Sequence, residues 1–207
     1  MNFDPLIHHR RSIRLKDYDY SQPGVYFITL VTQDRVNLFG EITDGMVRLN
    51  RLGEIIRSTW LRLSEFFPLG FDEWVIMPNH MHAIIWLLDS RKGEASATAS
   101  NGDPKSGSAD ASPQHRPIGT RASSLGAIIQ NFKSISARNI HKNFKEARTG
   151  EAFTLYRVKN ALDAAPQHVW QRNYYEHVVR NQSELDRIRS YIIDNPRRWV
   201  EDPEYKE

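Results

Sequence analysis

Two histidines, His80 and His82, stand one residue apart in the most apolar stretch of the sequence, residues 71–88, which read FDEWVIMPNHMHAIIWLL. The apolar segment from 80 to 88 is short, and this length favours a strand over a helix. Side chains alternate between the two faces of a strand, so both imidazoles point the same way while Met81 points to the other side. Two imidazoles held side by side on a strand provide half of a metal site.

A pair of histidines at this spacing also has an incidental interpretation. The chain has eight histidines, and His8-His9 forms a second close pair. A metal site therefore requires a further ligand from elsewhere in the chain, together with a group able to react. The sequence has no cysteine, so a thiolate metal site and a disulfide framework are both excluded.

The further ligand and the reactive group are predicted in the C-terminal helix. Its packing stripe consists of Leu185, Ile188 and Ile192. Tyr191 and Asn195 are roughly 40° apart around the helix axis and lie at the edge of this stripe. A helix packed with this edge over the histidine strand would bring a phenol and an amide oxygen next to the two imidazoles. The alternative is structural, with Tyr191 at the border of the core and Asn195 ending the helix before Pro196.

Together these groups would suit phosphoryl transfer. Two imidazole nitrogens and an amide oxygen are three neutral ligands for a divalent ion, which would polarise a scissile phosphate. A phenol with a pKa of about 10 is a poor nucleophile at neutral pH. It therefore needs this help and a rigid helix that holds its oxygen in line. The product would be a phosphotyrosine, which conserves the energy of the phosphodiester for a later rejoining.

The elements that must position these groups follow from apolar periodicity and turn residues. Strands are predicted over 25–32, 74–77, 80–88 and 168–179, a hairpin over 38–49 that turns at Asp44-Gly45, and helices over 50–67, 123–143 and from the capping box Ser183–Asp186 to Pro196. Asn50 is expected to cap the first helix. This order predicts an α+β fold: a ferredoxin-like (βαββαβ) antiparallel sheet with helices on one face plus a C-terminal catalytic helix.

The 207 residues are expected to form a single domain with two additions. Residues 1–16 look like a basic arm, whose four basic residues against one aspartate equal the net charge of +3. Residues 89–122 consist mainly of Ser, Ala, Gly, Asp and Pro, which predicts a disordered low-complexity insertion. No stretch is long and apolar enough to span a membrane, and no signal peptide is visible, so a cytoplasmic location is expected.

Clusters of basic residues on this near-neutral chain indicate a polyanion partner, and an ordinary solvated surface accounts for them equally well. Candidates for contacts to DNA are Arg10, Arg11 and Arg14 in the arm, Arg138 and Lys142 on the exposed side of the helix over 123–143, and Trp170, Arg172 and Tyr174 in the aromatic segment. The alternative for Trp170 is a place in the core.

Three segments resemble one known family. The run MPNHMHAIIWL resembles the His-hydrophobe-His motif of the single-tyrosine (Y1) transposases of the HUH type. The segments RRSIRLKDYDYSQPGVYFITLVTQDR and VWQRNYYEHVVRNQSELDRIRSYIIDNPRRW resemble the opening and the C-terminal signature of the IS200-like branch called REP-associated tyrosine transposases. The resemblance covers most of the chain outside 89–122 and parts of 144–166.

The resemblance implies a DNA transposition enzyme that cleaves and rejoins single-stranded DNA beside short hairpins, such as REP-like repeats. Such an enzyme leaves a 5′-phosphotyrosine and a free 3′-OH. Carried to this chain, the resemblance implies that Tyr191 attacks the phosphate and that His80, His82 and Asn195 bind a divalent cation, Mg²⁺ or Mn²⁺. Asn195 stands where many Y1 relatives have Gln. Some Y1 transposases exchange the tyrosine helix between subunits, whereas resemblance to the REP-associated branch implies that this protein acts as a monomer.

Other interpretations compete with this assignment. Tyr174 and Tyr175 are alternative nucleophiles, because Tyr174 and His177 would share a face if that segment were helical. Arg180, with Glu176 and His177, looks like part of a family motif and is either structural or in contact with DNA. The protein could also be a non-catalytic DNA-binding or regulatory relative on the same fold. The presence of the histidine pair, the tyrosine and the asparagine favours the enzyme.

Overall fold

The computed structural model describes residues 18–89, 123–147 and 166–205. The arm with Arg10, Arg11 and Arg14, and the predicted insertion after Asp89, lie outside the described residues. Within the three described ranges, every helix is too short or too polar to cross a lipid bilayer.

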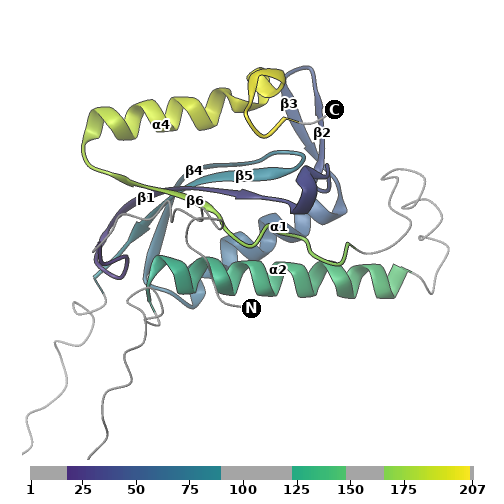
Figure 1. The fold of residues 1–207 in the computed structure, drawn as a ribbon, viewed down its shortest axis with the longest axis horizontal. Helices are drawn as coiled ribbons and strands as arrows, with labels where there is room; N and C mark the ends of the chain where they lie inside the picture. Colours follow the sequence, from purple (N-terminus) through teal and green to yellow (C-terminus); the bar gives the residue numbers. More distant parts are fainter. Residues whose placement is uncertain (1–17, 90–122, 148–165, 206–207) are drawn as a thin grey trace, which may run out of the picture.

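The centre of the fold is a four-stranded antiparallel sheet (Figure 1). Its strands are β1 (Gly24–Val31), β4 (Leu69–Ile76), β5 (His80–Leu87) and β6 (Tyr175–Val179), in the spatial order β4-β5-β1-β6. The β-branched and aromatic residues of β1 suit a central strand, which pairs with β5 on one side and β6 on the other. This order is that of a βαββαβ sheet, so the predicted ferredoxin-like architecture is confirmed.

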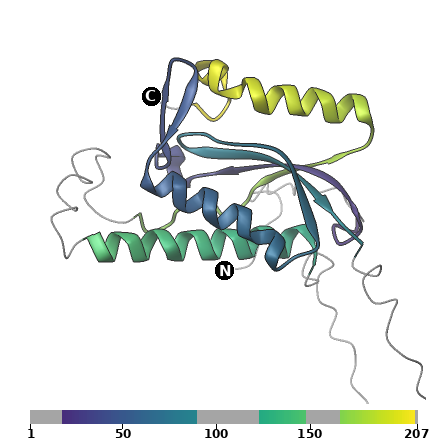
Figure 2. The same ribbon diagram turned by 180° about the vertical axis from the view of Figure 1, so that it is seen from behind.

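In the described ranges, three α-helices pack on this sheet: α1 (Arg51–Leu61), α2 (Leu125–Ala147) and α4 (Gln182–Asp194). Helices α1 and α2 cover one face, and α4 lies on the other face (Figure 1 and Figure 2). The side chain of Asn50 accepts hydrogen bonds from the backbone N–H groups of Leu52 and Gly53, so the predicted cap of α1 is confirmed. The sheet therefore separates a two-helix layer from the single helix that carries the predicted nucleophile.

A separate two-stranded hairpin lies at its predicted place. It consists of β2 (Gly40–Thr43) and β3 (Met46–Leu49). Its turn residues, Asp44 and Gly45, have φ angles of 54° and 70°, as a two-residue hairpin turn requires. The hairpin contacts the 3₁₀ helix Asn195–Glu201, which follows α4 (Figure 1).

The two faces of the sheet have different cores. On the α1 and α2 side, a large cluster of buried apolar side chains includes Trp60 and Phe132, whose ring centroids are 5.2 Å apart. On the α4 side, the buried apolar cluster is small and consists of Phe27, Ile84, Leu185, Ile188 and Ile192. The buried polar side chains of Thr29, His80 and His82 lie on this second side.

Several predicted element boundaries were wrong. Helix α1 ends at Leu61 rather than near residue 67, and α2 continues to Ala147 rather than ending near residue 143. The cap of α4 is Asn181, two residues before the predicted cap Ser183, because the Asn181 side chain accepts the hydrogen bond from the backbone N–H of Glu184. Asparagine caps helices at least as well as serine, so local preference did not separate the two positions. Strand β4 begins at Leu69 rather than Trp74, since its pairing with β5 continues past an irregularity.

The strand predicted over 168–179 is regular only in its second part, β6. Before β6 the chain makes a single antiparallel bridge from Trp170 to Thr32. The Trp170 ring is buried, and its N–H donates to Ser136 Oγ at 2.9 Å. A buried indole needs such a partner. This contact with α2 holds the segment outside the regular strand ladder.

Candidate active site

His80 and His82 lie on β5, and only 0% and 3% of their surfaces are exposed. Strand alternation places them on the α4 side of the sheet, while Met81 packs in the large core on the other side. The Nε2 atoms of the two histidines are 3.0 Å apart. The two imidazoles therefore point the same way, as their spacing predicts.

Each imidazole is held through its other nitrogen. His80 Nδ1 is 2.9 Å from the side-chain oxygen of Asn79, whose amide nitrogen donates to two backbone carbonyls. The Asn79 oxygen is therefore an acceptor, so His80 Nδ1 carries the proton and His80 Nε2 has a free lone pair. His82 Nδ1 is 2.8 Å from the Thr29 hydroxyl, which can accept the matching proton. Such outer partners orient histidines that bind metals.

Tyr191 reaches the histidine pair from α4 of the same chain. Its hydroxyl oxygen is 3.1 Å from His82 Nε2, and it donates to Asp202 Oδ2 at 3.2 Å. The ring packs edge-on against Phe27, with 6.1 Å between the centroids. Tyr191 is 38% exposed, so its hydroxyl lies between the buried cluster and the surface.

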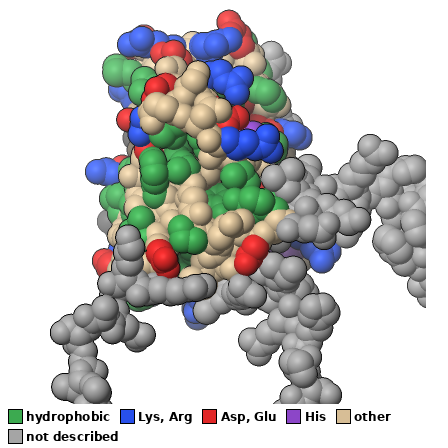
Figure 3. Space-filling view, turned by 90° about the vertical axis from the view of Figure 1, so that its left-hand side faces the viewer, with side chains coloured by type: hydrophobic (Ala, Val, Ile, Leu, Met, Phe, Trp, Pro, Cys, Tyr) green, Lys and Arg blue, Asp and Glu red, His purple; other side chains and the backbone are tan. Residues whose placement is uncertain are grey.

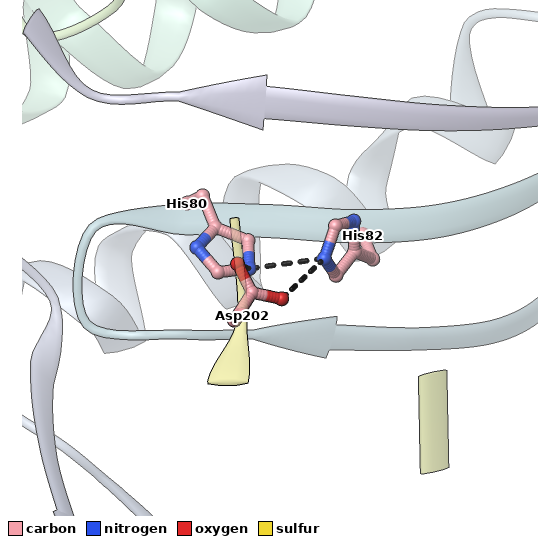
Figure 4. A group of neighbouring side chains, drawn as sticks. All are labelled: His80, His82 and Asp202. Atoms are coloured by element: carbon pink, nitrogen blue, oxygen red, sulfur yellow. Dashed lines mark hydrogen bonds and ion pairs between the residues drawn. The ribbon is translucent and has the colours of Figure 1, made fainter. Parts of the chain in front are cut away.

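Asp202 completes the cluster and was not predicted from the sequence. Figure 4 shows its carboxylate beside both imidazoles. Its Oδ1 is 3.9 Å from His80 Nε2, and its Oδ2 is 3.6 Å from His82 Nε2. One ligand atom from each of the three residues lies within 4.8 Å of the others. The sequence signal at this position is weak, because an Asp-Pro pair indicates only a turn.

Asn195, the predicted third ligand, also lies in this cluster. It is 3% exposed, and its amide nitrogen donates to Asp202 Oδ2 at 2.7 Å. Among the described residues, its side-chain oxygen is buried without a hydrogen-bond partner. A buried oxygen left in this way costs free energy, which a bound cation would offset. Two imidazoles, a carboxylate and an amide oxygen form a donor set that suits a divalent cation.

The charges of the site also depend on burial. Burial, with a smaller effect of His82, lowers the pKa of His80 to about 3, so this imidazole is neutral and able to bind a metal. Burial raises the pKa of the Tyr191 phenol, and Asp202 adds to the effect. Burial acts to raise the pKa of Asp202, but the neighbouring His82 ring and the hydrogen bond from Asn195 hold it well below its usual range. The site is therefore negative and needs a nearby positive charge to ionise the phenol.

The segment that carries Asp202 is tied to distant parts of the chain. Glu204 forms an ion pair with Arg35 at 2.8 Å, and its backbone carbonyl accepts a hydrogen bond from Asn79. The backbone N–H of Glu204 donates to Asp202 Oδ1 at 2.7 Å. These contacts bring a carboxylate from the end of the chain to the histidine strand.

Tyr174 and Tyr175 do not form a rival site. The segment before β6 is not helical, so Tyr174 and His177 do not share a helix face. His177 instead lies against α4, with 2.8 Å between its Nε2 and Glu184 Oε1. Within the described residues, the tyrosine hydroxyl hydrogen-bonded to the histidine pair is that of Tyr191.

The predicted DNA-binding residues lie on several surfaces. Arg138 and Lys142 are exposed on α2, on the opposite side of the sheet from α4 (Figure 1). Arg172 and Arg180 are exposed before and after β6. Trp170 needs a correction, because its ring is 7% exposed and packs in the core, where it cannot stack on a base. Figure 3 shows Lys and Arg side chains gathered in its upper part, the layer of α4.

The sequence of the whole chain is similar to known proteins. No protein-family model matches the sequence. An uncharacterised protein of Haemophilus influenzae is 37% identical over 200 residues, which cover 96% of this chain and 94% of that protein. A second protein of Haemophilus influenzae, provisionally named a REP-associated tyrosine transposase, is 21% identical over 178 residues, or 86% of this chain and 73% of that protein.

A solved structure has the same fold. It is that of a REP-associated tyrosine transposase bound to a REP hairpin, with a TM-score of 0.51 and 17% identity over 90% of this chain and 73% of that chain. The chain thus shares the fold of a REP-associated tyrosine transposase and resembles, at low identity, a protein provisionally given that name. Because the matches run over most of this chain, the similarity is not confined to the histidine strand.

Proposed function

We propose that this protein is a metal-dependent transposase that cleaves and rejoins single-stranded DNA beside hairpins through a phosphotyrosine at Tyr191. One observation carries the proposal: the Tyr191 hydroxyl lies 3.1 Å from His82 Nε2, in a buried cluster that also holds His80 and Asp202. Similarity to a REP-associated tyrosine transposase in fold, and to a protein provisionally so named in sequence, supports the reaction class. The relative solved with a REP hairpin supports hairpin DNA as the substrate class.

The proposed cleavage exchanges one phosphate ester for another. The Tyr191 oxygen attacks phosphorus, and the bond from phosphorus to the 3′ oxygen of the preceding nucleotide breaks. The protein keeps the 5′-phosphoryl end as a tyrosine ester, and the released strand ends in a 3′-hydroxyl. Overall, one proton moves from the phenol to the leaving 3′ oxygen, and Asp202 Oδ2, which accepts the phenol hydrogen bond, is placed to carry it. Attack by another 3′-hydroxyl on the phosphotyrosine reverses these bond changes and joins two ends.

Four groups would hold the divalent cation, Mg²⁺ or Mn²⁺: His80 Nε2, His82 Nε2, the Asp202 carboxylate and Asn195 Oδ1. When bound, this cation supplies positive charge that polarises the phosphate and offsets the negative charge of the site. The fit rests on the convergence of the two Nε2 atoms and on the buried Asn195 oxygen, which has no other partner among the described residues.

Exposed basic residues are proposed to contact the DNA backbone, which positions the strand without reading its sequence. The candidates are Arg172 and Arg180 beside β6, Arg138 and Lys142 on α2, and Arg10, Arg11 and Arg14 in the arm, outside the described residues. Because Tyr191 meets the histidines of its own chain, one chain holds every proposed part of the site. This arrangement supports a monomeric enzyme.

The proposed nucleophile is tested with a hairpin-flanked single-stranded oligonucleotide carrying a label at its 3′ end. The wild-type protein should form a denaturation-resistant adduct that retains this label, whereas a 5′ label should leave with the released strand. Tyr191→Phe should form no adduct and still bind the oligonucleotide. Tyr175→Phe is the matched control and should form the adduct normally. An undiminished adduct with Tyr191→Phe would rule out Tyr191 as the nucleophile.

The proposed metal dependence is tested by chelation. Cleavage should stop in excess chelator and return when Mg²⁺ or Mn²⁺ is added. Asn79→Ala removes the partner that orients His80, so metal affinity should fall about 10- to 100-fold while DNA binding persists. Cleavage that continues in chelator would contradict the metal site. Hairpin binding with no adduct under any metal condition would instead support a non-catalytic DNA-binding relative.

A further inference from the structure

A cleft of about 380 Å³ opens beside the proposed nucleophile. It is lined by Tyr191 and His82 of the site, by the rings of Phe27 and Tyr175, and by Gln171 and Asn173 from the segment before β6. This volume is near the lower end of the range of about 300–1,000 Å³ for small-molecule sites. The cleft therefore suits one small planar group and is too small for a double helix.

Tyr175 supplies an exposed aromatic ring next to the nucleophile. It is 47% exposed although it belongs to a paired strand. Its ring is held edge-to-face against Phe27, with 6.1 Å between the centroids, and Phe27 lies at the same distance from the ring of Tyr191. An aromatic ring that is held by a neighbour and still about half exposed is the kind of platform on which unpaired bases stack.

Gln171 and Asn173 bring hydrogen-bonding groups to the same cleft. In the part of the chain that the structure describes, neither side-chain amide has a hydrogen-bond partner. Each amide offers both a donor and an acceptor, which matches the mixed donors and acceptors on the edge of a base. The cleft thus combines a stacking surface with groups able to distinguish one base from another.

Lys133 of α2 holds the backbone of this segment in place. Its ammonium donates to the carbonyls of Gln171 at 2.8 Å and Asn173 at 3.0 Å. Burial lowers the pKa of Lys133 to about 8, because the ammonium is partly removed from water. A recognition segment fixed in this way loses little freedom when it binds.

We propose that this cleft binds one unpaired nucleobase of the DNA strand, next to the phosphate that Tyr191 attacks. The base stacks on Tyr175 and forms hydrogen bonds with Gln171 and Asn173, so the cleft selects the nucleotide that flanks the cleavage position. Holding that base also holds the adjoining phosphate against the nucleophile. The inference rests on the proposed strand-cleaving function, because contact with Tyr191 is what assigns the cleft to the DNA strand.

The test is an abasic scan of a hairpin oligonucleotide, measured by fluorescence anisotropy with the Tyr191→Phe protein so that the DNA stays intact. One abasic position at a time is introduced along the unpaired flank. Binding should weaken about 10-fold or more at one position and little at its neighbours, as expected for loss of one stacked base.

Variants then assign this position to the cleft. In the same background, Tyr175→Ala should weaken binding of the intact oligonucleotide by a similar factor and add nothing to the abasic penalty. Tyr175→Phe keeps the ring and should bind like the parent. Gln171→Ala should change the preference among bases at this position and leave the abasic oligonucleotide unaffected. An unchanged Tm for each variant confirms that the fold persists.

The possible failures are distinguishable. A flat abasic scan, or penalties that remain additive with Tyr175→Ala, would overturn the base site. The covalent adduct of the wild-type protein with unmodified DNA tests cleavage separately. A position-specific penalty without an adduct would support the base site and contradict the proposed cleavage. An adduct with a flat scan would support the proposed cleavage and contradict the base site.

Discussion

The two faces of the sheet bury different kinds of side chain. On the α1 and α2 side, Ile28 and Leu30 of β1 and Met81 of β5 enter the large apolar cluster. On the α4 side, the intervening positions include Thr29 and His82, and the apolar cluster is small. Because alternate residues of a strand face opposite ways, the same strands stabilise the fold on one face and carry the chemistry on the other.

Polar contacts compensate for the small apolar cluster under α4. Nε and Nη2 of Arg189 each donate to the Asp72 carboxylate at 2.7 Å, which makes a bidentate pair. The same carboxylate accepts a hydrogen bond from Trp86 Nε1 at 2.8 Å. We therefore expect α4 to open at a lower free energy than α1 or α2, because it buries less apolar surface.

The largest effect is expected from a cavity on the α1 and α2 side. Trp60→Ala should lower the free energy of unfolding by about 3–5 kcal/mol, because Trp60 is fully buried between Phe71 and Phe132. Leu61→Ala, at a position that is 44% exposed, is the control and should change stability by less than about 0.5 kcal/mol. Urea denaturation measures both, and equal effects would contradict the assigned place of Trp60 in the core of this side.

A cavity under α4 should lower the free energy of unfolding by less than a cavity on the other side, and it should loosen the candidate site before the rest of the fold. Ile192→Ala should lower the free energy of unfolding by about 2–3 kcal/mol, since its cluster is small. Ile193→Ala, at a neighbouring position that is 60% exposed, is the control. Hydrogen exchange should speed up in α4 before α2. Uniform acceleration of both helices would show that the two sides unfold as one unit.

The Asp72–Arg189 pair makes α4 sensitive to pH. The hydrogen bonds from Arg189 lower the pKa of Asp72 to about 2. The stability that this ion pair contributes is therefore complete above the ordinary carboxyl pKa of about 4 and is lost as the pH falls through about 2. Asp72→Asn should therefore cost about 1–2 kcal/mol at pH 7, with water screening part of the attraction. The difference from wild type should shrink between about pH 4 and pH 2. A constant difference over this range would contradict the assigned pair.

The smallest effect is expected at the helix cap. Asn181→Ala should lower stability by about 1 kcal/mol, because it removes the acceptor for the backbone N–H of Glu184. Ser183→Ala is the matched control, since Ser183 lies inside the helix and is exposed. Thermal unfolding compares the two variants. A larger loss of stability for Ser183→Ala would indicate that Ser183, the residue predicted from the sequence, is the cap.

Local rules were sufficient for much of the fold. The shared orientation of His80 and His82, the turn at Asp44-Gly45 and the Asn50 cap each depend on a few neighbouring residues, and each is present as predicted. The order of the elements also led to the correct sheet, because a βαββαβ chain has few ways to bury one face of each element. Even the edge position of Tyr191 on its helix followed from apolar spacing.

Only the tertiary structure decided which distant groups meet the histidines. Asp202 follows no periodic pattern, and its place depends on contacts of Glu204 with Arg35 and Asn79, far away in the sequence. The cleft beside Tyr191 likewise forms from separate strands and an irregular segment. Periodicity within an element determines which side a residue faces, whereas its partners across space depend on the packing of the whole chain.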